Sequence, residues 1–163
     1  MLEADRLVIY AASEQEMLRI AEAEEDEALR EAYREMLRGS LENPEDWGWH
    51  AMWLIVRKDG KHIGSLAFKG SPVDGAVEVG YGIAEEYRGL GYATEALETL
   101  LMWAFDQPGV KRVEAETRED NPASRKVLEH CGFAPNGVMG REGPRFVRTN
   151  DVPDDEDEWD LGF

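Results

Sequence analysis

Cysteine is nearly absent from the sequence, which has a single one, Cys131, among 163 residues. A lone cysteine cannot form an internal disulfide, so we expect a reducing compartment, the cytoplasm. No apolar run approaches the roughly 18 residues that a membrane-spanning helix needs, and the N-terminus lacks an apolar signal core. These absences argue against a disulfide-rich secreted module and against a membrane protein.

Basic residues are also scarce, with 18 Lys and Arg against 35 Asp and Glu, a net charge of −17. Such a surface repels nucleic acid and anionic membranes, so we expect neither as a partner. Residues 151–160 hold acids but no base, and residues 14–42 are acidic too. We interpret 151–163 as a solvated acidic C-terminal tail, with a surface for a basic partner as the alternative, and 1–150 as one domain. The second acidic stretch permits a cationic substrate.

The pattern of turns and periodicity predicts a mixed α/β (α+β) fold. Ser13 to Glu16 is a capping box that opens the first of two helical segments, and the second is expected to stop at Gly39. Asp59-Gly60 predicts a hairpin turn. The expected strands are 6–11, 49–58, 62–69, 76–83, 112–117, 133–139 and 145–148. Because the first strands form a meander, a doubly wound nucleotide fold is excluded.

A glycine-rich loop, Tyr87 to Glu95, joins a predicted strand to a predicted helix. Small residues let backbone N–H groups converge, and a helix N-terminus adds partial positive charge, so the loop could hold a phosphate. It is not a P-loop, since no lysine follows, and a dinucleotide fingerprint would need glycine where Thr94 stands. A tight turn without a ligand is the alternative.

Several segments together resemble a known family. Arg88 to Ala93 matches the R/Q-x-x-G-x-G/A motif of the GNAT acetyltransferases, and Glu78 to Ile83 resembles their fourth strand. Asn121 to Arg125, followed by Gly132-Phe133, resembles the N-x-x-S segment and G-F ending of the branch related to ribosomal-protein N-terminal acetyltransferases. Arg6 to Ile9 resembles that branch's opening strand. The resemblance implies a mostly antiparallel sheet of about seven strands with helices on both faces.

The resemblance also implies a cosubstrate, acetyl-coenzyme A (acetyl-CoA), and the residues that bind it. Its diphosphate is expected on the backbone amides of Arg88, Gly89, Gly91, Tyr92, Ala93 and Thr94. Its pantetheine arm would pair with the strand at Tyr81, Gly82 and Ile83 and contact Asn121. Arg125 would lie near the adenosine phosphates. No metal is expected, because the three histidines lack metal-ligand spacing.

Direct transfer of acetyl to an amine needs a base for the ammonium proton and an acid for the leaving sulfur. Glu78 is the candidate base, and we expect partial burial to raise its pKa. The alternative is a glutamate on a solvated strand face. Ser124 is the candidate acid, because the matching serine has that role in the related branch. The alternative is a serine that only caps its own helix.

The acceptor would be an amine of a small molecule or a protein N-terminus. Trp49 and Trp53, expected on one strand face, and Trp47 could stack on it or pack against the helices. A polyamine, an aminoglycoside and a basic protein N-terminus all fit the acidic helices. A non-catalytic acetyl-CoA sensor of the same fold is the alternative to an enzyme, and a homodimer is compatible with the fold.

Overall fold

The computed structural model describes residues 1–150, so the predicted acidic tail lies outside the described residues. The strands are β1 (Leu2–Glu3), β2 (Leu7–Ala11), β3 (Met52–Arg57), β4 (His62–Phe68), β5 (Ala76–Ile83), β6 (Arg112–Glu116), β7 (Ala134–Met139) and β8 (Pro144–Thr149). The α-helices are α1 (Glu14–Ala23), α2 (Glu27–Glu42), α3 (Trp47–His50), α4 (Tyr92–Asp106) and α5 (Pro122–His130). Short 3-10 turns, η1 (Pro44–Asp46) and η2 (Glu85–Tyr87), precede α3 and α4.

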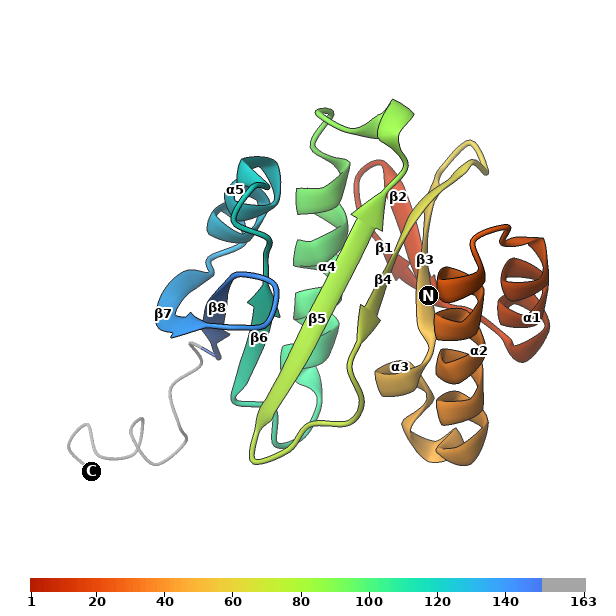
Figure 1. The fold of residues 1–163 in the computed structure, drawn as a ribbon, viewed down its shortest axis with the longest axis horizontal. Helices are drawn as coiled ribbons and strands as arrows, with labels where there is room; N and C mark the ends of the chain where they lie inside the picture. The colour runs from red at the N-terminus through yellow and green to blue at the C-terminus, as the bar shows by residue number, and fades with distance from the viewer. Residues whose placement is uncertain (151–163) are drawn as a thin grey trace, which may run out of the picture.

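The strands form one mixed sheet in the order β1-β2-β3-β4-β5-β6-β8-β7. Every neighbouring pair is antiparallel except β5 and β6, which are parallel. Helices α1 and α2 cover one face of the sheet, and α4 lies behind the other (Figure 1). The predicted mixed sheet with helices on both faces is therefore confirmed. The structure has one strand more than the seven that the sequence predicts. The additional strand is β1, whose two residues are too few to give a period-2 pattern.

The first helix begins as the sequence predicts, and the second ends later than expected. Ser13 caps α1 in a complete capping box with Glu16, and the Asp26 side chain caps α2. The expected stop at Gly39 is wrong, because α2 continues to Glu42. Glycine within a helix costs only about 1 kcal/mol, which the packing of α2 on α1 and α3 can offset.

Three tryptophans and a phenylalanine form an aromatic core between the helices and the sheet. The ring centroid of Trp49 lies 4.7 Å from that of Phe68 and 4.8 Å from that of Trp103, and those of Trp53 and Trp103 lie 4.9 Å apart. Trp49 belongs to α3, so the predicted strand from residue 49 actually begins at Met52, and the two tryptophans do not share a strand face. Trp49 and Trp53 are both buried, which confirms that these two side chains pack in the core.

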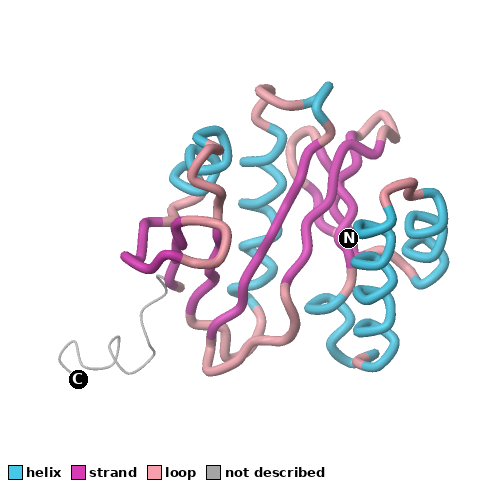
Figure 2. The backbone as a smooth tube through the Cα atoms, viewed as in Figure 1, coloured by secondary structure: helices cyan, strands magenta, loops and turns pink. Residues whose placement is uncertain are grey.

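The sheet splits between β5 and β6. Their parallel pairing covers three residues of each strand and ends at Glu78 opposite Glu114. Beyond Glu78, β5 continues to Ile83 and pairs with β4 only. Figure 2 shows this long strand crossing the middle of the molecule, with the end of β6 and helix α5 on one side. Within the described chain, the second half of β5 thus has one edge without a strand partner.

Candidate active site

The open edge of β5 presents the backbone groups of Tyr81 and Ile83. The carbonyl of Glu78 accepts a hydrogen bond from the N–H of Lys69 (2.9 Å), and the N–H of Ala84 donates to Ile63 (2.8 Å), so even-numbered residues face β4. Because backbone groups alternate along a strand, the odd-numbered ones face the gap. The Ile83 carbonyl already accepts from Nε of Arg88 (2.9 Å). An extended ligand arm would therefore find its backbone partners mainly at Tyr81.

The glycine loop ends next to this edge, at the start of α4. Gly89 and Gly91 both have positive φ, 76° and 83°, which only glycine adopts at little cost. Gly91 is the N-cap of α4 and provides no side-chain cap. The first N–H groups of the helix thus have no partner within it and carry the positive end of the helix dipole. This geometry suits a phosphate group.

A pocket of about 610 Å³ connects the loop, the open edge of β5 and helix α5. Its volume lies within the usual range of roughly 300–1,000 Å³ for small-molecule sites. All predicted site residues line it except Glu78 and Arg125. The complete lining is Tyr81, Gly82, Ile83, Tyr87, Arg88, Gly89, Gly91, Tyr92, Ala93, Thr94, Asn121, Ala123, Ser124, Lys126, Val127 and His130.

One face of α5 lines the pocket although the sequence did not predict it. Ala123, Lys126, Val127 and His130 recur at helical spacing, and all four line the pocket. Arg125 falls off this face. Ser124 gave no signal for Lys126, because residues two positions apart do not lie on the same face of a helix. Lys126 supplies positive charge suited to an anionic ligand.

Ser124 is hydrogen-bonded to Tyr81 across the pocket. The two hydroxyl oxygens lie 2.8 Å apart, and the Tyr81 hydroxyl also donates to the carbonyl of Ser124 (3.2 Å). The helix cap is provided by Asn121, whose side-chain oxygen accepts from the N–H of Ser124 (3.1 Å). The Ser124 hydroxyl is therefore not used to cap its own helix. Burial raises the pKa of Tyr81, so its hydroxyl stays protonated at neutral pH.

Glu78 lies outside the pocket, and the alternation of side chains along β5 places it on the opposite face of the sheet from Tyr81. Its carboxylate contacts Nζ of Lys69 (2.7 Å) and Nη2 of Arg145 (2.8 Å). Burial acts to raise the pKa of Glu78, but these two cations together hold it below its usual value. The expected raised pKa is thus wrong, because two cationic side chains outweigh the desolvation.

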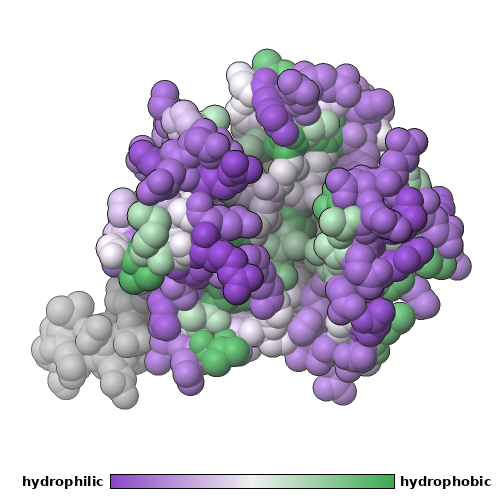
Figure 3. Space-filling model, in the orientation of Figure 1, coloured by the Kyte–Doolittle hydropathy of each residue, from purple (hydrophilic) through white to green (hydrophobic). Residues whose placement is uncertain are grey.

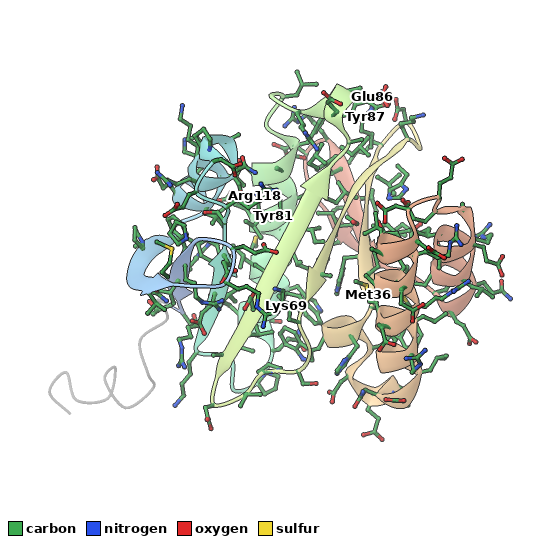
Figure 4. All side chains as sticks on the ribbon, in the orientation of Figure 1. Met36, Lys69, Tyr81, Glu86, Tyr87 and Arg118 are labelled. Carbon is green, nitrogen blue, oxygen red and sulfur yellow. The ribbon has the colours of Figure 1, made fainter. Side chains whose placement is uncertain are left out.

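The sheet face that carries Glu78 is hollowed beside it. Gly80 and Gly82 share this face, and a Cβ at either would meet no atom within 4 Å. Figure 3 shows the hollow in the middle of the molecule, with a pale to green floor between hydrophilic flanks. Met36 lies on the α2 side of it (Figure 4). The hollow and the pocket thus meet at β5 from opposite faces.

Residues 2–134 match the family described as acetyltransferase (GNAT) domain. The chain belongs to the GNAT acetyltransferases. Among relatives of this GNAT chain, an uncharacterized N-acetyltransferase of Bacillus subtilis, YjdG, is 38% identical over 86 residues, covering 52% of this chain and 51% of that protein. The ribosomal-protein-serine acetyltransferase of Escherichia coli is 29% identical over 93 residues, covering 56% and 51%. The chain spans about half the length of these curated relatives.

The fold of this GNAT chain is also that of solved acetyltransferase structures. The ribosomal L7/L12 alpha-N-protein acetyltransferase RimL, in complex with coenzyme A, superposes with a TM-score of 0.73 at 21% identity, covering 92% of this chain and 97% of that one. Within residues 1–150, no helix is long and apolar enough to cross a membrane. The same residues contain no group of three or more His, Cys, Asp or Glu side chains placed to hold a metal.

Proposed function

We propose that the protein is an acyltransferase that moves the acetyl group of acetyl-CoA directly to a primary amine. The observation that carries the proposal is the pocket, which joins an uncapped helix N-terminus, an open strand edge and a hydrogen-bonded serine. Membership of the GNAT family supports the same chemistry. A sensor would need only the first two features, so the Tyr81–Ser124 pair favours an enzyme.

The pocket residues fit acetyl-CoA by charge and shape. The first turn of α4 and the side chain of Lys126 would hold the diphosphate, although the whole chain is acidic. The free backbone groups of Tyr81 would pair with the pantetheine arm, and Asn121 lies at the same wall. When bound, acetyl-CoA would supply a thioester whose carbonyl carbon the amine attacks. Ser124, which Tyr81 holds in place, would give the proton of its hydroxyl to the leaving sulfur.

The acceptor is best explained as an α-amino group, such as a protein N-terminus. Attack requires the neutral amine, and Glu78, with its lowered pKa, is a weak base for an ammonium group. An α-amine has a pKa of about 8 and is partly neutral without help, whereas a lysine or polyamine amine, at about 10, is not. Glu78 would then accept the proton through water. The name of the Escherichia coli relative, a ribosomal-protein-serine acetyltransferase, supports a protein as the acceptor.

Calorimetric titration with acetyl-CoA, free coenzyme A and NAD tests the cosubstrate. We expect binding of the first two at micromolar concentration and none of NAD. The acceptor is tested by thiol release with three amines: a peptide with a free N-terminal serine, the same peptide blocked at its N-terminus but containing lysine, and spermidine. Turnover of the first peptide alone supports the proposal. Preference for spermidine would overturn the proposal of an α-amino acceptor. Absence of acetyl-CoA binding would overturn the proposed function as a whole.

A further inference from the structure

Arg6, just before β2, contacts the glycine loop and the start of α4 from outside the pocket. Its Nη1 donates to the carbonyl of Leu90 (2.9 Å), and its Nε donates to Oε1 of Glu95 (2.7 Å). Its backbone N–H donates to Oε2 of the same carboxylate (2.8 Å). Its guanidinium lies 4.4 Å from the centre of the Tyr92 ring. One side chain thus ties together three successive parts of the loop and helix, 84 to 89 residues away in the chain.

The bond to Leu90 fixes the orientation of the loop backbone. The carbonyl of Leu90 and the N–H of Gly91 belong to one planar trans peptide unit, so they point in opposite directions. Because Arg6 holds the carbonyl on the outside, the N–H of Gly91 turns to the other side. Gly91 lines the pocket there. Because Leu90 stands between Gly89 and Gly91, both with positive φ, this peptide unit would be free to rotate without that bond.

The pairing with Glu95 removes an unfavourable charge. The Glu95 side chain is mostly buried, 17% exposed, in the first turn of α4. A carboxylate there suits the helix dipole, but it would repel a diphosphate at the same helix end. Arg6 contacts both carboxylate oxygens and so neutralises it in place. Arg6 thus bonds to protein groups and would affect a bound anion indirectly, through the loop backbone.

We propose that Arg6 is a positioning residue for diphosphate binding, which orients the Gly91 N–H and neutralises Glu95. This inference rests on the proposed use of acetyl-CoA. It requires that loss of the Arg6 side chain weaken the binding of ligands that carry the diphosphate. The reactivity of a thioester without the diphosphate must stay unchanged. A residue that merely supported the fold would affect both equally.

The test compares Arg6→Ala with the wild-type full chain, using acetyl-CoA and S-acetylpantetheine, which has no diphosphate or nucleotide. We expect the Kd for acetyl-CoA to rise about tenfold, as for loss of one charge-assisted hydrogen bond, with kcat/KM for S-acetylpantetheine unchanged. Arg38→Ala is the matched control, because it removes the same charge from the exposed surface of α2, where Arg38 is paired with Glu35. It should bind acetyl-CoA as the wild type does.

The double variant Arg6→Ala/Glu95→Ala separates orientation from charge. If Arg6 orients the loop, the double variant stays weak although no carboxylate remains; full recovery of affinity would overturn the orienting role. Equal losses with both thioesters, or no loss in Arg6→Ala, would overturn the proposal as a whole. Should Arg6→Ala fail to fold, Arg6→Lys keeps the charge but loses the planar fork, and must still weaken acetyl-CoA binding. Absence of binding by the wild type would instead refute the proposed function.

Discussion

The hydroxyl groups of Tyr81 and Ser124 lie 2.8 Å apart and join strand β5 to helix α5 across the pocket. Two residues 43 positions apart in the sequence thus form one polar unit where the sheet splits. Tyr81 was expected to pair with the pantetheine arm, and its side chain also fixes the position of the serine. Ser124 lies in the first turn of α5, which Asn121 caps, so both ends of this contact rest on ordered elements.

Replacing Tyr81 by phenylalanine should lower kcat more than it raises KM. The ring is kept, while the hydroxyl that holds Ser124 is lost, so we expect turnover to fall about tenfold. Ser124→Ala should cost about 10²-fold, and the double variant should cost no more than Ser124→Ala alone, because residues that act as a unit are not additive. Thiol release at saturating acetyl-CoA measures all three.

Tyr10→Phe is the control for that series. Tyr10 also carries a hydrogen-bonded hydroxyl, 2.7 Å from Oε2 of Glu16, but it joins β2 to α1 away from the pocket. Its loss should leave turnover unchanged. Simple additivity of Tyr81→Phe and Ser124→Ala would mean that the two hydroxyls act independently.

Gly91→Glu should abolish tight binding of acetyl-CoA. It places a negative side chain at the N-terminus of α4, where its Cβ would lie 3.3 Å from Nη2 of Arg6, the group that holds the loop that we assign to a diphosphate. We therefore expect the Kd to rise about 10²-fold or more. Gly109→Glu is the matched control, because Gly109 also has positive φ, 80° against 83°, and lies in the turn after α4. Both variants should lose similar thermal stability from backbone strain. Only Gly91→Glu should lose affinity, and equal affinities would contradict the placement.

The sequence predicted the parts of the site that depend on local chemistry. The turn at Gly89 and Gly91 and the capping box at Ser13 each follow from residue types at short spacing, and the structure has both of them. The short helix at Trp49 was missed, because four residues next to an apolar strand give no helical period of their own.

Features that depend on distant residues could not be predicted. Burial acts to raise the pKa of Glu78, but Lys69 and Arg145 together lower it, and Arg145, which also contacts Glu116, lies 67 residues away. The position of Arg6 on the glycine loop is set by the pairing of β2 in the sheet and by packing against α4. Neither arrangement leaves a pattern at fixed sequence spacing, so burial alone suggested the wrong direction for the Glu78 pKa.

Glu78→Gln should slow turnover most at low pH. If Glu78 takes the ammonium proton through water, its loss matters while the acceptor is protonated, and we expect about a tenfold decrease at pH 7. Above the α-amine pKa of about 8, the amine is neutral by itself and the difference should shrink. The pH profile of kcat/KM with the serine peptide measures this. Glu114→Gln, in the same charged cluster, is the control, and a constant ratio across pH would exclude Glu78 as the base.

Glu78 should also stabilise the fold in a pH-dependent way. Its folded-state pKa is lowered, so its contribution is fully present above the unfolded-state pKa of about 4.3 and is lost as pH falls through the folded-state value. Urea unfolding should therefore show Glu78→Gln less stable than the wild type at pH 7. The gap should narrow as the pH drops below about 4. A gap of constant size would mean that the variant acts through packing rather than through the ion pairs.

Cys131 should be inert in the folded protein. It is buried, its thiol contacts the carbonyl of Thr94 at 3.6 Å, and burial raises its pKa to about 12. At pH 8 its thiolate fraction is then about 10⁻⁴, too small for reaction with Ellman's reagent on the minute scale. We expect one reactive thiol in urea and none in buffer.

Because the thiolate is the nucleophile, the same argument excludes an acetyl-cysteine route, and Cys131→Ala should retain turnover. Rapid labelling of the native protein would show instead that the contact between the end of α5 and the first turn of α4 opens.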